Sequence, residues 1–128
     1  MNPNTTFLIG TQLVKLCNTG KALEAINTLY APNIVSIEAV ANPNFSQRLE
    51  GLAAVKGKAE WWIGNHEIHK EEAQGPWPHG ERFIVRFLYE VTAKTGPMAG
   101  QRMKLDEAAL YTVKDGKIVQ EEFFYFMG

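Results

Sequence analysis

Residues 111–126, YTVKDGKIVQEEFFYF, contain the turn and the strand on which the interpretation of the fold depends. Two runs rich in β-branched and aromatic residues flank KDG, a combination typical of a β-hairpin. The second run carries Glu121 and Glu122 between KIV and FFYF, where a strand that packs on a core is expected to be apolar. Because successive side chains on a strand point to opposite faces, one of these carboxylates should lie on the buried face.

The length of the turn decides which glutamate faces the core. We favour a three-residue loop that ends with Gly116 in the left-handed conformation, followed by a bulge. This register pairs Ala109 with Glu121 and pairs Glu107 with Phe123. Glu107 is the one acidic residue on the apolar face of its own strand, so Glu107 and Glu121 would be diagonal neighbours on that face.

The alternative is a two-residue loop made of Asp115 and Gly116. This loop would place Glu122 and Phe124 beside Glu107 instead. Either register puts two carboxyl groups on an apolar face, where desolvation raises each pKa and mutual repulsion makes one group keep its proton. Such a pair separates an acid from a base near neutral pH.

The first half of the chain has helical periodicity and one short strand. Apolar residues recur at helical spacing in three segments, and a β-branched run follows the second of them. The segments are a helix within 4–18, a helix that begins at Lys21 and ends before Pro32, a strand at 34–40 and a helix at about 52–62, with a polar loop at 41–50.

The second half of the chain alternates with a period of two residues and contains turn sequences. It predicts strands at 66–74, 82–92, 102–113 and 117–127, separated by GPWPHGE, TGPMAG and KDG. Helices followed by long strands indicate an α+β fold, with helices packed on one face of a curved antiparallel sheet.

The composition limits the class of protein. The chain has 128 residues, of which 45% are hydrophobic and 21% charged, so we expect a single globular domain spanning 1–128. A net charge of −1 without a basic stripe argues against a nucleic-acid partner. Cys17 is the single cysteine and falls among core positions. No signal peptide and no apolar run of about 20 residues is found, so we expect a cytoplasmic protein without membrane contact.

Several sequence blocks resemble one superfamily. LYAPN before the first strand, EGLAAVKGKAEWW in the third helix and DGKIVQEEFFY at the end resemble the nuclear transport factor 2-like superfamily, and in particular its SnoaL-like bacterial proteins. The similarity covers about residues 5–127. It implies a cystatin-like cone, in which a strongly curved sheet wraps three N-terminal helices and encloses an apolar pocket. The superfamily includes isomerases, polyketide cyclases, dehydratases and non-catalytic binding modules.

The steroid isomerases of this superfamily use an acidic base late in the first strand, a tyrosine on the first helix and an acid on the fourth strand. The resemblance places Glu38 at the position of the base. The tyrosine position falls on Leu13 and the strand-four acid on Ala109, so two of the three groups are absent and that reaction is disfavoured. In the favoured register Glu121 lies opposite Ala109, from where it would supply a carboxyl group on the neighbouring strand.

Histidine and aromatic side chains are the remaining candidates for ligand contacts. His66 and His69 are three positions apart on a strand and so point to opposite faces, which is not the helical zinc spacing, and we expect no metal site. His69 and Tyr111 are predicted to orient the substrate. No phosphate loop, nucleophile elbow or cofactor fingerprint occurs, and no cofactor is expected. The predicted pocket wall consists of Tyr30, Trp61, Trp77, Phe87, Tyr89, Tyr111 and Phe123.

These observations predict a protein that binds a small apolar or polycyclic molecule. If it is an enzyme, it is a cofactor-independent isomerase, cyclase or dehydratase, with Glu38 or Glu121 as the base and Glu107 as the protonated partner. The alternatives are a non-catalytic binding module and a dimerisation module whose cavity is filled by side chains. The resemblance also implies a homodimer through the outer sheet face, for which we expect Leu110, Ile118, Phe124 and Phe126 to form the contact.

Overall fold

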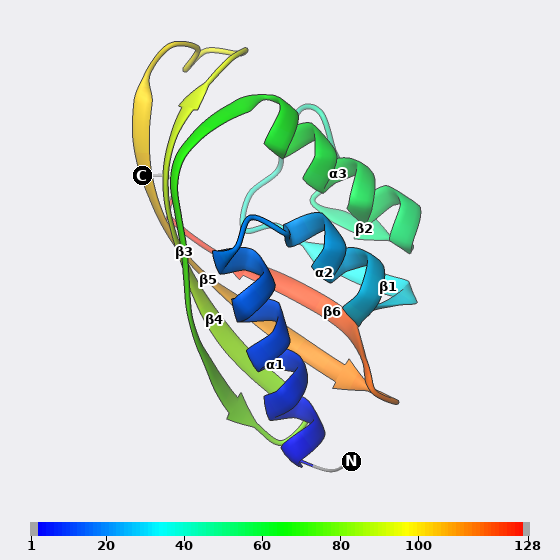
Figure 1. Ribbon diagram of the computed structural model, residues 1–128. Coiled ribbons are helices and arrows are strands. Elements are labelled where there is room, and N and C mark those ends of the chain that lie inside the picture. Colours follow the sequence, from blue (N-terminus) through cyan, green and yellow to red (C-terminus); the bar gives the residue numbers. More distant parts are fainter. Residues whose placement is uncertain (1–2, 127–128) are drawn as a thin grey trace.

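The hairpin of residues 111–126 forms part of the last two strands of a six-stranded sheet in the computed structural model, which describes residues 3–126 (Figure 1). Three helices pack on this sheet, as the sequence predicted. In chain order the elements are α1 (Pro3–Asn18), α2 (Ala22–Leu29), β1 (Tyr30–Ile37), β2 (Arg48–Glu50), α3 (Leu52–Gly64), β3 (His66–His79), β4 (Arg82–Ala93), β5 (Arg102–Lys114) and β6 (Lys117–Phe124).

The sheet is mixed rather than purely antiparallel. Its strands lie in the order β2-β1-β6-β5-β4-β3, and β1 pairs with β6 in parallel. Hairpins force antiparallel pairing only on strands that a short turn joins, and β1 and β6 come from opposite ends of the chain. The prediction of an antiparallel sheet is therefore wrong for this one pair. The parallel pairing matters for the site because it brings Ser36 beside Glu121.

The turn between β5 and β6 has two residues, so the favoured three-residue loop is wrong. Lys114 pairs with Lys117, and Asp115 and Gly116 have φ angles of 52° and 78°. Positive φ at both central positions is the requirement of a type I′ turn, for which Asp-Gly is a preferred sequence. The alternative two-residue loop is the one observed.

A bulge in β6 then restores the predicted face of Glu121. Thr112 pairs with Gln120 while the next residue, Val113, pairs with Ile118, so Val119 is an extra residue in β6. The bulge shifts the rest of the strand by one position. Tyr111 therefore faces Glu121, which is only 4% exposed.

The same register corrects two expectations. Ile118, predicted on the outer face, is completely buried. Glu107 and Glu121 are not diagonal neighbours, because Ala109, which lies two residues from Glu107 on β5, pairs with Phe123 rather than with Glu121. The two carboxyl groups are thus further apart along the strands than the favoured register implied.

Several boundaries also differ from the prediction, including the end of β1 at Ile37 and the end of β6 at Phe124. Tyr30 begins β1 instead of lying in the second helix, and the short strand β2 occupies part of the predicted polar loop. Trp77 belongs to β3, which continues to His79, rather than to a turn. Pro and Gly in the sequence GPWPHG suggested a turn, but the strand passes them with a register shift between Gln74 and Trp77.

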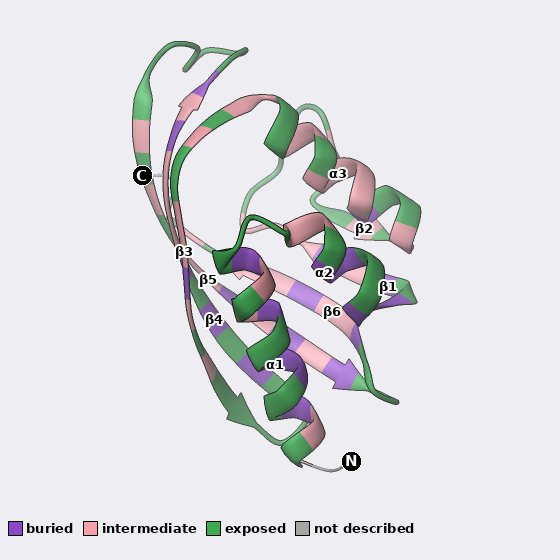
Figure 2. Ribbon diagram, viewed as in Figure 1, coloured by how far each residue is buried: buried purple, intermediate pink, exposed green. Residues whose placement is uncertain are grey.

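The helices cover one face of the sheet. The contact of α1 with the sheet is close, whereas the residues of α3 are less deeply buried. α1 packs along β3 and β4, and its Gly10 lies directly on this contact, because a Cβ there would be 2.7 Å from Cβ of Pro76. Figure 2 shows many half-buried residues along α3, which contacts β1, β2 and β3. Within residues 3–126 no helix is long and apolar enough to cross a membrane. The apolar pocket expected at the open end of the cone stays a prediction.

Candidate functional site

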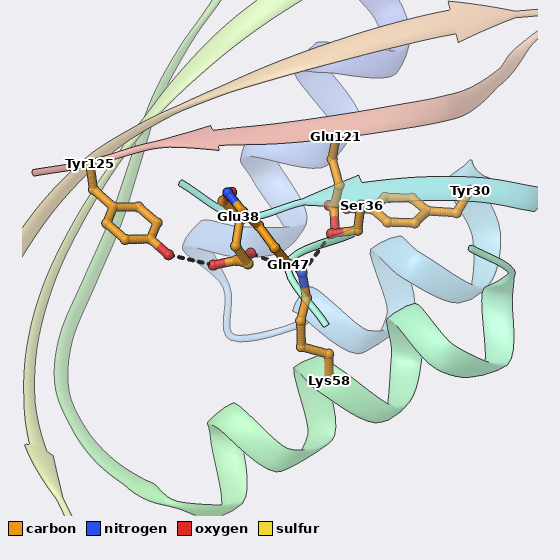
Figure 3. Close-up of polar contacts among 7 residues, drawn as sticks. All are labelled: Tyr30, Ser36, Glu38, Gln47, Lys58, Glu121 and Tyr125. Carbon is orange, nitrogen blue, oxygen red and sulfur yellow. Dashed lines mark hydrogen bonds and ion pairs between the residues drawn. The ribbon is translucent and has the colours of Figure 1, made fainter. Parts of the chain in front are cut away.

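Glu121 lies in the core and both of its carboxylate oxygens accept hydrogen bonds. The Tyr30 hydroxyl donates to Oε1, and Ser36 Oγ donates to Oε2 at 2.6 Å (Figure 3). Ser36 is the direct partner of Glu121 in the parallel β1–β6 pair. Burial raises the pKa of Glu121, while the hydrogen bonds from Ser36 and Tyr30 and the charge of Lys58 lower it. Glu121 is therefore a buried acceptor whose oxygens are already occupied.

Lys58 on α3 connects this buried acid to a second glutamate. Its Nζ donates to Ser36 Oγ at 2.6 Å and to Glu38 Oε2 at 2.8 Å. The hydroxyl of Tyr125 donates to the other oxygen of Glu38, Oε1, at 2.8 Å. The side chains of Lys58 and Glu38 are 15% and 23% exposed, so this ion pair lies nearer to solvent than Glu121.

Six side chains thus form one continuous hydrogen-bonded path, which we call the Glu121–Glu38 network. In order it consists of Tyr30, Glu121, Ser36, Lys58, Glu38 and Tyr125. The path runs from the core to the half-buried rim, and Lys58 is the one cation in it. An ammonium group has three N–H donors and two of them are used here, so one remains for a further acceptor.

Glu107 is a carboxyl group of a different kind. It is half-buried on β5 and has no hydrogen bond or ion pair with any residue from Asn4 to Phe126. Burial raises its pKa from 4.5 to about 7, with smaller increases from the charges of Glu38 and Glu121, while Lys58 lowers it. A free carboxyl that titrates near neutral pH can either give or take a proton under physiological conditions.

Aromatic rings line the face of the sheet that carries Glu107. Phe87, which pairs directly with Glu107, stacks on Tyr89 with ring centroids 5.9 Å apart. Tyr89 also contacts Trp62 of α3 at 5.1 Å. Phe123 lies below Lys58, whose Nζ is 5.4 Å from the ring centroid. These contacts give the surroundings of Glu107 and Lys58 an apolar wall.

Not every predicted site residue lies near these groups. Trp77 pairs with Ile84 on the opposite face of the sheet and is 54% exposed, so it does not belong to the predicted wall. Trp61 packs on Phe45, with ring centroids 5.5 Å apart, and on His66. His69 contacts Thr92, with Nε2 at 2.7 Å from Oγ1, and is not a member of the Glu121–Glu38 network.

Sequence reasoning missed Ser36, Lys58 and Tyr125. Lys58 follows Val55 by three positions and so borders the inward stripe of its helix, a spacing that could have identified it. Tyr125 has the same parity as Glu121 and Phe123 on the last strand. Ser36 gave no comparable signal, because its role depends on the parallel β1–β6 pairing.

Hollows on the surface of the described chain lie away from the Glu121–Glu38 network. One, of about 440 Å³, lies between α1 and α2 and is lined by Lys15, Leu16 and Leu29 among others. Another, of about 310 Å³, lies over β3, β4 and β5, and its lining comes mostly from the outer face, including Lys70, Leu88, Lys104 and Asp106. Among residues 3–126 no group of three or more His, Cys, Asp or Glu side chains is arranged to hold a metal ion.

Comparison with known proteins identifies a family and solved structures that resemble this chain. The SnoaL-like domain family matches residues 5–125. A solved structure from Mesorhizobium loti, named as a candidate SnoaL-like polyketide cyclase, is 36% identical with a TM-score of 0.85, over 92% of this chain and 97% of that chain.

Two further structures share the fold at lower identity. A cystatin-like protein from Xanthomonas campestris is 21% identical, with a TM-score of 0.74 over 98% of this chain and 91% of that chain. An NTF2-like protein from Burkholderia pseudomallei is 15% identical, with a TM-score of 0.75 over 98% and 92%. None of the curated proteins matches the sequence. The family match and the Mesorhizobium structure show that the chain belongs to the SnoaL-like family.

Proposed function

We propose that this protein binds a small apolar molecule on the inner face of the sheet and transfers a proton at a carbon next to a carbonyl group. The reaction would be of the isomerase, cyclase or dehydratase type and would use no cofactor. The observation that carries the proposal is Glu107, a half-buried carboxyl without a protein partner and with a pKa raised to about 7. The name of the Mesorhizobium relative, a candidate polyketide cyclase, agrees with this class of reaction.

The roles that we propose differ from those predicted from the sequence. Glu121 is buried with both oxygens occupied, and Glu38 accepts from Lys58 and Tyr125, so both compete poorly as bases. In our proposal the carboxylate of Glu107 takes the proton from carbon, and the electron pair of the C–H bond moves to the carbonyl oxygen. The free N–H of Lys58 stabilises the resulting enolate, and Glu107 then returns the proton to a different atom of the substrate.

Deuterium exchange tests this proposal without knowledge of the natural substrate. 2-Tetralone is a bicyclic ketone with activated C–H bonds, and their exchange in D₂O is followed by NMR. We expect the wild-type protein to accelerate exchange with an inflection near pH 7, and Glu107→Gln to lose about 100-fold or more of the acceleration. Glu122→Gln is the matched control. It makes the same chemical change, but Glu122 lies on the outer face of the sheet, away from Glu107. Equal rates for Glu107→Gln and wild type would refute the assignment.

The non-catalytic alternative predicts a different result in the same experiment. A binding module would bind 2-tetralone, detectable as a rise in Tm, and would not accelerate exchange above the rate of buffer. Glu107→Gln would then bind the ketone as well as the wild type does. The two readouts together separate an enzyme from a carrier or sensor.

We also propose that a second copy of the chain covers the outer face of the sheet. Trp77 pairs with Ile84 and Ile84 pairs with Leu110, so these apolar residues form one row across three strands. Trp77 and Ile84 are exposed, as is Phe124 in the adjacent row on β6. A contiguous exposed apolar patch of this kind is typical of an interface. Light scattering should give the mass of a dimer for the wild type and of a monomer for Ile84→Glu; a monomeric wild type would contradict the proposal.

A further inference from the structure

Tyr111 presents a hydroxyl that forms no hydrogen bond within the part of the protein that the structure describes. The residue is 2% exposed, and its ring stacks on Phe83 with centroids 4.9 Å apart. Its hydroxyl nevertheless forms no hydrogen bond with any residue of the described range. Tyr30, equally deep in the core, donates its hydroxyl to Glu121. Among the described residues the only enclosed side-chain N or O atom without a hydrogen-bond partner is Oγ1 of Thr6. The hydroxyl oxygen of Tyr111 therefore keeps access to water or to a bound molecule, and its partner is expected to come from there.

Tyr89 repeats this arrangement on the neighbouring strand. Its ring is held between Phe87 and Trp62, and its hydroxyl also has no hydrogen-bond partner from Asn4 to Phe126. Burial raises the pKa of both phenols well above 10, so both keep their protons and act as donors at neutral pH. Tyr89 and Glu107 are both close enough to Tyr111 for their charges to raise its pKa further, which places the three groups around one region.

We propose that Tyr89 and Tyr111 donate hydrogen bonds to oxygen atoms of the bound molecule, which is therefore a flat compound carrying at least one carbonyl or hydroxyl oxygen. Its apolar frame would pack on Phe87 and Phe123, which lie on the same face of the sheet. The molecule is not an anion, because an anion would be repelled by the nearby carboxyl groups of Glu107 and Glu121. The inference deepens the proposed function and rests on the same site binding a small molecule.

A pair of isosteric ligands tests the two phenols directly. 2-Acetylnaphthalene and 2-isopropenylnaphthalene have the same shape, but only the first has an acceptor oxygen. We expect the wild type to bind the ketone at least about 10-fold more tightly, measured by quenching of tryptophan fluorescence. Tyr111→Phe and Tyr89→Phe should each reduce this preference by about 3- to 10-fold, the value of one neutral hydrogen bond, and should leave the affinity for the hydrocarbon unchanged.

Tyr30→Phe is the matched control, because it removes a hydroxyl that is already committed to Glu121. It should lower the Tm and keep the ligand preference. Tyr111→Phe and Tyr89→Phe should not lower the Tm, since no protein hydrogen bond is lost with either hydroxyl. This opposite pattern of stability and binding is what a hydroxyl kept for a ligand predicts, and a merely structural tyrosine would not produce it.

Three results would overturn the inference: equal affinity of the wild type for the two naphthalenes, binding of neither up to its solubility limit, or an unchanged preference in both tyrosine variants. The measurement is an equilibrium one and does not depend on proton transfer. If 2-tetralone does not exchange while the ketone preference is lost in Tyr111→Phe and Tyr89→Phe, the proposed catalysis is wrong and the ligand class stands.

Discussion

The hydroxyl of Ser36 joins Lys58 to Glu121: it accepts a hydrogen bond from Nζ at 2.6 Å and donates one to Oε2 at 2.6 Å. The lysine and the buried glutamate are therefore coupled through a neutral side chain rather than in direct contact. This link anchors Lys58 to the core and leaves its second donor for Glu38, at 2.8 Å. The position of the cation beside the proposed substrate site thus depends on residues that the substrate does not reach.

Replacing Glu121 should destabilise the protein strongly. In Glu121→Gln the hydroxyl of Tyr30 or Ser36 loses an acceptor and faces an amide N–H instead. We expect the free energy of unfolding to fall by about 2–4 kcal/mol, because buried donors are left without partners. The measurement is urea denaturation at pH 7.5. The same substitution at Glu122 should change the free energy by no more than about 0.5 kcal/mol, and equal losses for the two variants would contradict the assignment of the faces.

Replacing Lys58 should change the titration of Glu107. The positive charge of Lys58 lowers the pKa of this carboxyl, so Lys58→Met should raise it above the wild-type value of about 7. The pKa is measured from the NMR chemical shift of the Glu107 side-chain carbon as pH is varied. Lys56→Met, on the same helix, removes an equal charge that does not act on Glu107 and serves as the control. A downward shift in Lys58→Met would show that the two groups are not coupled as described.

The stability of the protein should depend on pH through Glu107. Its pKa is raised from 4.5 to about 7 on folding, so the folded state holds this proton more tightly than the unfolded state does. The resulting stabilisation is complete below pH 4.5 and is lost as pH rises to about 7. Glutamine mimics the protonated form. Glu107→Gln should therefore match the wild type near pH 4.5 and exceed it by about 2 kcal/mol at pH 8.

Urea denaturation of both proteins across this range measures the difference. A gain in stability for Glu107→Gln that is the same at every pH would mean that Glu107 does not titrate between 4.5 and 7.

Two helical glycines should respond in opposite ways to alanine. In Gly10→Ala the new Cβ would lie 2.7 Å from Cβ of Pro76 and 3.1 Å from Cδ2 of Phe83, so α1 must shift away from the sheet. Overpacking of this kind costs about 1–3 kcal/mol. A Cβ on Gly57 of α3 meets no atom within 4 Å, and Gly57→Ala should gain up to about 1 kcal/mol of helix propensity. Thermal unfolding checks both, and a stabilised Gly10→Ala would contradict the close packing of α1.

The sequence predicted elements better than it predicted the contacts between them. Period and turn residues located α1, α3, β4 and β5 closely, since these signals are local. The prediction that Glu121 points inward assumed a three-residue turn, which does not occur. Glu121 nevertheless points inward, because the bulge in β6 compensates for the shorter turn. Ser36 and Lys58 come together with Glu121 through the β1–β6 pair and through the packing of α3. Both contacts join segments that are distant in the sequence, so local sequence patterns do not predict them.

Val119 has a consequence for other chains that carry two adjacent glutamates after a similar hairpin. With a two-residue turn, the identity of the interior acid depends both on the number of residues between the glycine and the pair and on whether one of those residues forms a bulge. Deletion of Val119 would remove the bulge and leave residues 120–124 in their present register, whereas a regular strand that kept Val119 would turn these residues over and exchange the environments of Glu121 and Glu122. An alignment that ignores the bulge would therefore equate carboxylates that lie on opposite sides of the sheet.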